Sequence, residues 1–297
     1  MVTKSIREKS ETILYLLPLL IGLAVFKIWP LVQVILISFR EEYHQLLNTD
    51  AGIGFGNYQA VLTDEAFLQA IGNTVTCVVF VVLVTGVLSV LLSWSLFRNT
   101  KGGWFFRTVI FLPFVCSEVA VGACWRLMFH DNGIVNQVLK MMQLPQIGWL
   151  SDKDFSLAIL IVFGIWNALP MSAMLLYCSL QSLDNHLLIA AKTDRASEWK
   201  MLRFIGIPHL KTTLMLTAFI NCIGAWLTFN GLFPLFSGLP GPFYNLYTLV
   251  YYIYDAASGG RNMLGVACAA SVLLLSFLLI FLLIRCMYEI KKQFAPK

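Results

Sequence analysis

The sequence predicts an all-α integral membrane protein with six transmembrane helices. Of its 297 residues, 58% are hydrophobic and 12% are charged, whereas an ordinary soluble domain carries about 25% charged residues. The apolar residues gather in six runs, each near the roughly 20 residues that a bilayer crossing needs. Polar segments between the runs are alternately basic and acidic. We therefore expect one membrane domain over residues 1–297.

The six predicted spans share this length and apolar composition, and they cover residues 12–38, 72–97, 107–129, 155–181, 212–236 and 263–284. Lys27 and Pro30 interrupt the first span near its far end. The third contains Pro113 and Glu118. No internal repeat is visible, and no linker is long enough to separate domains.

The distribution of charge predicts the orientation. With the N-terminus in the cytoplasm, most of the 21 Lys and Arg residues fall on the inner segments 1–11, 98–107, 182–211 and 285–297, and the acids collect outside. This pattern follows the positive-inside rule. Both termini are expected in the cytoplasm, and the net charge of +5 indicates contact with membrane lipid and not with nucleic acid. The seven Cys lie in or beside apolar runs without metal-ligand spacing, so we interpret them as packing thiols.

The loop 183–210 is the most charge-dense segment between two apolar runs. Asp184 can cap a short helix, and Asp194 with Arg195 suits a turn. Ser197 can begin a second short helix, which Gly206 and Pro208 are expected to end. An amphipathic linker lying on the lipid headgroups is the alternative interpretation.

The same loop resembles the cytoplasmic loop of binding-protein-dependent ABC importer permeases. Ala190, Ala191, Asp194, Ala196, Ile205, Pro208 and Leu210 stand at the spacing of that family's motif, with Ser197 and Trp199 where many sugar permeases have them. Ile189 replaces the family's opening Glu, and Arg195 replaces its Gly. In the family this loop docks into a groove of the ATPase subunit. The resemblance therefore implies a set of ATPase-coupling residues: Ala190, Ala191, Asp194, Arg195, Ala196, Trp199 and Pro208.

The resemblance extends over nearly the whole chain. The opening run YLLPLLIGLAVFKIWPLVQVILISF, the segment FGNYQAVL, the third span with its Gly-Ile-Val-Asn turn, WNALPMSAMLLYCSLQSL and TLVYYIYDAA all fit in order. The opening is similar to the first permease of the maltose and glycerol-3-phosphate type. This implies the fold of a type I ABC importer permease in a bacterial cytoplasmic membrane. It also implies a second permease subunit, two ATP-binding subunits and an extracytoplasmic solute-binding protein as partners.

The chain carries no hydrolytic motif. It has no GxxxxGK[ST] phosphate loop and no GxSxG elbow, and its four His are scattered near the membrane edges. We therefore expect a transport subunit and not an enzyme. No cofactor is expected in this chain, because ATP and Mg would be bound by the partner ATPase.

A solute pathway needs polar and aromatic groups that face protein or water. The candidates from the residues themselves are Ser117, Glu118, Trp166, Asn167, Met171, Asn221, Thr228, Phe229 and Asn230. Hydrogen bonding between helices for packing alone is the alternative role. Resemblance to the maltose-type permease implies sugar contacts at Ser117, Val121, Gly164, Asn167, Ala168, Met171, Asn221, Gly224, Ala225 and Thr228. Several of these are small or apolar here, which favours recognition by the external binding protein.

Glu118 is the one acid predicted far from both membrane edges. Burial near the bilayer centre costs roughly 2.5–3.5 kcal/mol on insertion scales. Arg126 lies eight residues on, about 12 Å along a helix axis, which is too far for a direct pair. We expect Glu118 in the wall of a cavity, with a protonated carboxyl packed between helices as the alternative.

The leading hypothesis is the permease subunit of an ABC importer that moves a carbohydrate, such as an oligosaccharide or a related polar solute, by alternating access. The alternative is an ion-coupled secondary transporter or a membrane-embedded enzyme. A carrier of that kind should show several intramembrane carboxylates and usually an internal repeat, and an enzyme should show a nucleophile near a base.

Overall fold

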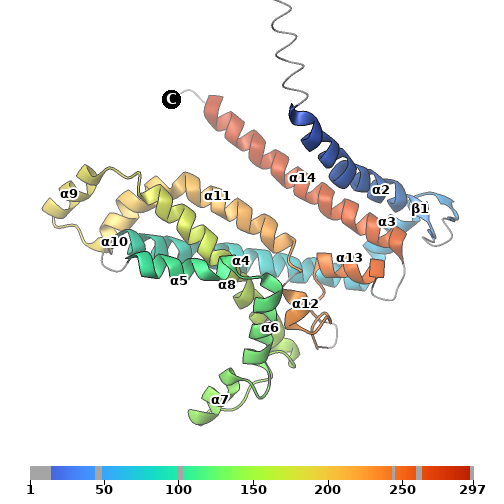
Figure 1. The fold of residues 1–297 in the computed structure, drawn as a ribbon, viewed down its shortest axis with the longest axis horizontal. Coiled ribbons are helices and arrows are strands. Elements are labelled where there is room, and N and C mark those ends of the chain that lie inside the picture. Colours follow the sequence, from blue (N-terminus) through green and yellow to red (C-terminus); the bar gives the residue numbers. More distant parts are fainter. Residues whose placement is uncertain are drawn as a thin grey trace, which may run out of the picture. The chain divides into compact units, whose positions relative to one another are not determined.

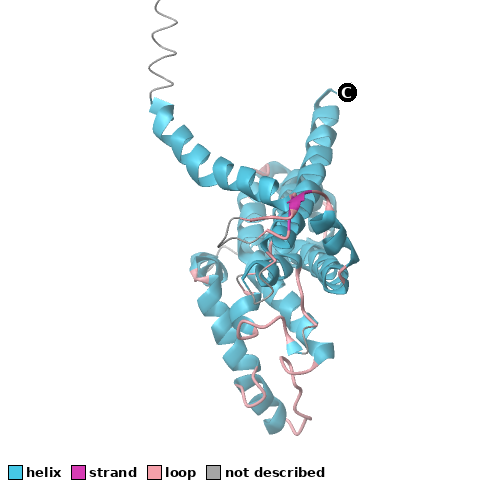
Figure 2. Ribbon diagram, turned by 90° about the vertical axis from the view of Figure 1, so that its right-hand side faces the viewer, coloured by secondary structure: helices cyan, strands magenta, loops and turns pink. Residues whose placement is uncertain are grey.

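The computed structural model describes residues 15–43, 49–98, 103–229, 231–242, 245–258 and 263–294, with side chains up to Met287. Figure 1 labels the elements, and Figure 2 shows that helices make up most of the described chain. The chain divides into two units, Met1–Asp64 with Tyr252–Lys297 and Glu65–Tyr251. The all-α prediction is confirmed, while the single domain over 1–297 stays a prediction.

The first unit holds the N-terminal apolar helix, Tyr15–Ser38, and the C-terminal helix α14, Leu264–Phe294. Helix α2 (Trp29–Ser38) and the short helix α3 (Gly56–Thr63) both pack against α14 (Figure 1). Strands β1 (Arg40–Glu41) and β2 (Gly52–Ile53) pair antiparallel between α2 and α3. This unit therefore brings the N-terminal and the C-terminal apolar helices together beside one short β-hairpin.

Asn57 ties α3 to the end of α2. Its side-chain amide donates to the carbonyl oxygens of Ser38 at 3.0 Å and Arg40 at 2.8 Å. A Cβ added to Gly265 of α14 would lie 2.7 Å from the Asn57 side chain, so α14 can approach this closely only with glycine at that position. The Asn of the FGNYQAVL segment thus has a packing role.

The N-terminal helix continues through Pro30 by way of a widened turn. The π-helical segment η1 (Ala24–Ile28) precedes Trp29, whose backbone N–H donates back to the Ala24 carbonyl five residues earlier. Proline lacks a donor and its ring would clash with the carbonyl four residues before it in a regular helix. A π turn shifts that carbonyl. The predicted interruption at Pro30 therefore changes the hydrogen-bond pattern locally from α to π, and the helix continues through the proline.

The second unit is a bundle of helices with a long insertion between two of them. Helix α8 packs against α4, α5 and α11, and α6 packs against α12. In chain order its helices are α4 (Glu65–Arg98), α5 (Gly103–Val115), α6 (Glu118–Phe129), α7 (Ile134–Met141), α8 (Lys153–Leu180), α9 (Asn185–Thr193), α10 (Glu198–Met201), η2 (Leu202–Gly206), α11 (Ile207–Trp226) and α12 (Leu232–Leu235). The boundary between the two units falls within α13 (Leu249–Ser258), after Tyr251.

Small and hydroxyl side chains line the buried face of α4. Ala70, Ser89 and Ser93 are buried, and both serine hydroxyls donate to carbonyls three residues earlier in the same helix at 3.0 Å. A Cβ on Gly164 of α8 would lie 2.9 Å from a methyl of Val81. Such residues let membrane helices approach closely, and this explains how α4 and α8 pack along their length.

Among the described residues, four helices are long and apolar enough to cross a membrane, and the bent pair Gly103–Val115 with Glu118–Met141 is a fifth candidate. The four are Tyr15–Ser38, Glu65–Arg98, Lys153–Leu180 and Leu264–Met287. Helix α11 covers most of the fifth predicted span, but His209 and Lys211 near its start lower its mean hydropathy. The count of six transmembrane helices stays a prediction.

Two predicted spans differ from the structure. The third was expected as one helix, but it breaks at Cys116 and Ser117, and the segments Gly103–Val115 and Glu118–Met141 on either side of the break are bent by 99°. Pro113 removes a backbone donor just before α5 ends. The fifth was expected to reach residue 236, but α11 ends at Trp226. The chain then runs through Thr228, whose carbonyl accepts from the Thr248 hydroxyl at 3.2 Å.

Candidate functional site

The loop 183–210 begins with the predicted capped helix. A carboxylate oxygen of Asp184 accepts from the backbone N–H of His186 at 2.9 Å and begins α9. This bond satisfies one of the four N–H groups that lack a partner at a helix start. Within α9, Leu188 is buried, Ala191 is half-buried and Ala190 is exposed. The two alanines therefore face different surroundings.

Helix α9 ends in a Schellman motif at the predicted turn. Arg195 has a φ of 54°, in the left-handed region. Its N–H donates to the Lys192 carbonyl at 3.0 Å, and the Ala196 N–H donates to the Ala191 carbonyl at 2.9 Å. These two bonds around a left-handed residue define the motif. Glycine adopts this conformation without strain, so the backbone explains why the ABC permease motif carries Gly where Arg195 stands.

The second loop helix begins as predicted and ends differently. The Ser197 hydroxyl accepts from the Lys200 N–H at 3.4 Å at the start of α10. The expectation that Gly206 and Pro208 end this helix is wrong, because η2 leads directly into α11. The N–H of Ile207 donates back five residues, so the wide turn accommodates Pro208.

A hydrophobic cluster joins the loop to the ends of α4 and α8. Its buried members are Val90, Trp94, Leu176, Leu180, Leu183, Leu188, Met201, Leu202 and Leu210. Ala191, Ala196 and Ile205 pack against it from the loop. A Cβ on Gly206 would lie 2.9 Å from the Trp94 ring, so this glycine permits close packing. The cluster fixes the loop to the bundle.

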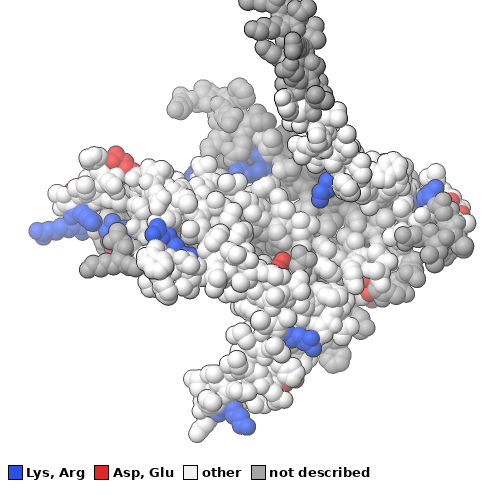
Figure 3. All heavy atoms as spheres, in the orientation of Figure 1, with Lys and Arg blue, Asp and Glu red and all other residues white. Residues whose placement is uncertain are grey.

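The exposed part of the loop is apolar and basic. Leu187, Ile189, Trp199 and Phe204 are exposed large hydrophobic residues. Lys192, Arg195, Lys200 and Arg203 are also exposed, and Figure 3 shows Lys and Arg atoms gathered at the α9–α10 end of this unit. A protein surface with acidic and apolar groups would complement this face.

A cavity of about 260 Å³ lies among α4, α5, α6, α8 and α11. Its lining includes the predicted substrate-path residues Glu118, Asn167, Met171, Asn221, Ala225 and Thr228. Gly164, Ala168 and Gly224, which the resemblance also implied, line it as well. Sequence reasoning missed the apolar part of the wall, which consists of Val81, Phe114, Phe163, Ile220 and Leu227. Single apolar residues on apolar helices carry no signal that would distinguish them.

Hydrogen bonds made by cavity-lining residues join neighbouring helices of the wall. The Asn167 amide on α8 donates to a carboxylate oxygen of Glu118 on α6 at 3.3 Å. Asn221 on α11 donates to the Ser172 hydroxyl on α8 at 2.9 Å, and its amide oxygen lies 3.2 Å from the same hydroxyl. Asn221 and Ser172 are both buried. Asn221 therefore holds α8 to α11 and also lines the cavity, which combines the two roles predicted as alternatives.

The break in the third span determines the position of Glu118. The residue stands in the first turn of α6, directly after the N-cap Ser117. The N-terminus of a helix carries partial positive charge that favours a carboxylate. The expected position of Glu118 in a cavity wall agrees with the cavity lining, and the break in the span adds a helix start beside the carboxylate.

The remaining predicted path residues lie elsewhere. Ser117 and Val121 do not line the cavity. Trp166 packs in an aromatic group, with its ring centroid 5.6 Å from that of Trp125 and 6.4 Å from that of Phe163. The ring of Phe229 lies tilted against that of Phe233, with the centroids 5.5 Å apart. Asn230 lies outside the described residues.

Asn136 in the Gly-Ile-Val-Asn turn serves the fold and not the cavity. It is buried, and its amide donates to the carbonyls of Asp131 at 3.0 Å and Ile147 at 2.9 Å. Its amide oxygen accepts from the Trp149 ring N–H at 3.1 Å. These bonds pin the connection between α7 and α8.

Comparisons with known proteins agree with this architecture. The family model described as "Binding-protein-dependent transport system inner membrane component" matches residues 85–290. The lactose transport system permease protein of Rhizobium radiobacter is 29% identical over 246 residues, which is 82% of this chain and 81% of the relative. The sn-glycerol-3-phosphate transport system permease protein of Agrobacterium fabrum is 27% identical over 276 residues, 92% of each chain.

A solved structure has the same fold. It is the crystal structure of a bacterial ABC transporter involved in the import of the acidic polysaccharide alginate, with a TM-score of 0.85, 21% identity and 99% of each chain covered. The fold is that of a type I ABC importer permease, a multi-pass membrane protein. The family match covers well over half of the sequence, so the chain belongs to the family of binding-protein-dependent transport system inner membrane components.

Proposed function

We propose that this chain is one of two non-identical permease subunits of an ABC importer that moves a carbohydrate or a related polar solute across the bacterial cytoplasmic membrane. The relatives of this chain support this solute class, since they include transport system permeases for lactose, for trehalose and maltose, and for arabinooligosaccharides. The family supports a transport role in the membrane.

The cavity is the observation that carries the proposal. Its wall combines the carboxylate of Glu118, the amide of Asn167 and the hydroxyl of Thr228 with the rings of Phe114 and Phe163. Hydroxyl-rich solutes are held by such acceptors and donors together with apolar planes. The groups come from α5, α6, α8 and the segment that follows α11, so relative movement of these parts would change access to the cavity.

ATP hydrolysis would enter through the loop 183–210. The exposed apolar and basic residues of α9 and α10, with Ala190 and Trp199 among them, would dock on an ATP-binding subunit. Closure of two such subunits around ATP and Mg would pull on the loop and turn the bundle from inward-facing to outward-facing. This places the loop and both termini in the cytoplasm, and an extracytoplasmic binding protein would deliver the solute.

Reconstitution of the complex tests the proposal. Proteoliposomes should contain this chain, the second permease and the ATPase, with the binding protein added outside and a panel of labelled neutral oligosaccharides as solutes. We expect ATP-dependent uptake that Asp194→Lys abolishes while the protein still inserts. Uptake without ATP, driven by an ion gradient, would contradict the proposal, and full-rate transport by this chain with only an ATPase would contradict the hetero-oligomer.

A further inference from the structure

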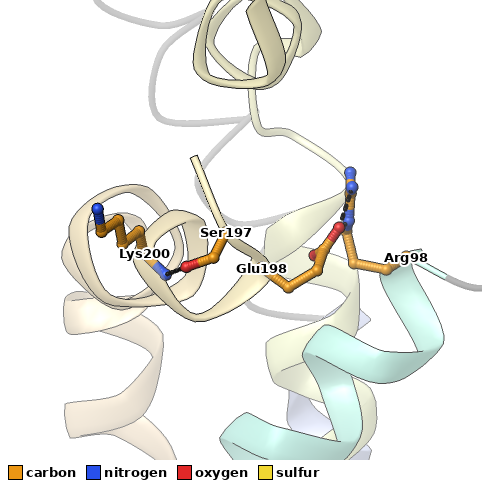
Figure 4. Close-up of polar contacts among 4 residues, drawn as sticks. All are labelled: Arg98, Ser197, Glu198 and Lys200. Atoms are coloured by element: carbon orange, nitrogen blue, oxygen red, sulfur yellow. Dashed lines mark hydrogen bonds and ion pairs between the residues drawn. The ribbon is translucent and has the colours of Figure 1, made fainter. Parts of the chain in front are cut away.

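A bidentate ion pair joins the end of α4 to the start of α10. The Arg98 Nε donates to one carboxylate oxygen of Glu198 at 2.9 Å, and an Nη donates to the other at 2.6 Å (Figure 4). The two residues are 100 positions apart in the sequence. Paired parallel hydrogen bonds of this kind fix the relative orientation of the two groups as well as their distance.

The surroundings favour both charges. Arg98 is in the last turn of α4 and Glu198 is in the first turn of α10, so each charge complements the partial charge of its own helix end. The guanidinium carbon lies 5.9 Å from the ring centroid of Trp94, which belongs to the buried cluster beneath the loop. The hydrogen bonds from Arg98 lower the pKa of Glu198 below its ordinary value.

Helix α4 connects this pair to the cavity. Val81 lines the cavity, and it precedes Arg98 by 17 residues, or about 25 Å along a helix. Helix α4 also packs against α8 and α11, which supply most of the cavity wall. A displacement of α10 that carries Arg98 with it would therefore move a helix whose middle, at Val81, lines the cavity.

We propose that Arg98 and Glu198 are a positioning pair that transmits movement of the loop 183–210 to α4. This role rests on the proposed function, since it presumes that an ATPase moves the loop. The hydrophobic cluster holds the loop and α4 together, but apolar contact is non-directional. The bidentate pair adds a fixed angle between α10 and α4, so that rotation of the loop becomes displacement of α4.

The pair should affect coupling far more than assembly. Glu198 is largely exposed, with 61% of its side-chain area accessible, and exposed ion pairs contribute little to stability. Removing either partner should therefore leave the loop docked on its cluster. Less of the movement of the loop would reach the cavity, and ATP would be hydrolysed with less solute moved.

The experiment measures ATP hydrolysis and uptake of a labelled neutral oligosaccharide by the reconstituted full complex. The variants are Arg98→Ala, Glu198→Ala and the exchange Arg98→Glu with Glu198→Arg. Lys211→Ala is the matched control, because Lys211 is an exposed base near the start of α11, outside the loop 183–210 and its docking face. Co-purification of the ATPase reports assembly.

We expect both single variants to assemble and to hydrolyse ATP within about twofold of the parent complex. Solute moved per ATP should fall by about fivefold or more, the low end of typical coupling effects. The charge exchange should recover part of this loss, and Lys211→Ala should leave the ratio unchanged.

An unchanged ratio in both alanine variants, an equal fall in Lys211→Ala, or no recovery in the charge exchange would overturn the inference. Loss of the assembled complex in Arg98→Ala would also overturn it, because the pair would then serve assembly. A parent complex that shows no ATP-dependent uptake would instead refute the proposed function, so the two failures are distinguishable.

Discussion

Replacing Arg195 by glycine should stabilise the turn between α9 and α10. Arg195 has a φ of 54°, and a non-glycine residue in the left-handed region costs roughly 1–2 kcal/mol. Glycine loses more backbone entropy on folding, which offsets about 0.5–1 kcal/mol. The difference leaves a net gain of between zero and about 1.5 kcal/mol for local closing of the turn.

Amide hydrogen exchange at the turn measures this gain. The Ala196 N–H donates to the Ala191 carbonyl within the motif, so it exchanges when the turn opens. Since about 1.4 kcal/mol is a factor of ten, Arg195→Gly should slow this amide by up to about tenfold. Arg195→Val is the matched control, and it should speed exchange because a β-branched residue is strained at this φ. Equal exchange in both variants would refute the left-handed conformation.

The same substitution separates the backbone role of Arg195 from its charge. An exposed ion pair with an acid on the ATPase would be worth only about 0–1 kcal/mol. Arg195→Gly should therefore keep its ATPase partner in co-purification and transport at a rate close to that of the parent complex. A complete loss of ATPase association in Arg195→Gly would show that the charge matters more than the reasoning allows.

Three further outcomes follow from the loop and the cavity. Ala190→Trp should abolish transport without unfolding the loop, because Ala190 is exposed. Ala191→Trp should also lower the melting temperature, because Ala191 packs on the buried cluster. Equal melting temperatures of the two variants would contradict this. Glu118→Leu should impair uptake far more than assembly, with Glu118→Gln in between, and parallel loss of both in the Leu variant would favour a packing role. The depressed pKa of Glu198 means that its pairing with Arg98 stabilises the loop above the unfolded value near 4.3 and is lost as the pH falls through the folded value. The exchange protection that the wild-type chain has over Glu198→Gln should therefore be full above the unfolded pKa and decrease as the pH falls through the lowered folded pKa.

Local signals in the loop were readable from the sequence because they depend on neighbouring residues. The Asp184 cap, the turn at Arg195 and the start at Ser197 each involve hydrogen bonds over two to five positions. The stop at Gly206 failed because a π turn lets a helix continue through a proline, and no composition rule predicts that turn. The pair of Arg98 with Glu198 was missed because it joins residues 100 positions apart.

The cavity could be predicted only in part for the same reason. Polar residues inside apolar spans identify candidates such as Asn167 and Asn221, but each can serve packing or a pathway. Resemblance to the permease family narrowed the positions, and Gly164 and Gly224 among them do line the cavity. The apolar part of the cavity wall, and the position of Trp166 outside that wall, depend on how the helices pack. The periodicity of the sequence does not determine this packing.

The break in the third span places Glu118, the acid predicted far from both membrane edges, in the cavity wall. An ionised Glu118 in a continuous helix would cost roughly 2.5–3.5 kcal/mol near the bilayer centre. In the structure it stands in the first turn of α6 and accepts a bond from Asn167. A helix N-terminus supplies about 0.3–2 kcal/mol and a hydrogen bond to a charged group about 1.5–3 kcal/mol, which together are close to the cost. The break after Pro113 therefore places the Glu118 carboxyl at a helix start and beside the Asn167 amide, and both contacts offset part of the cost of burying it in the cavity wall.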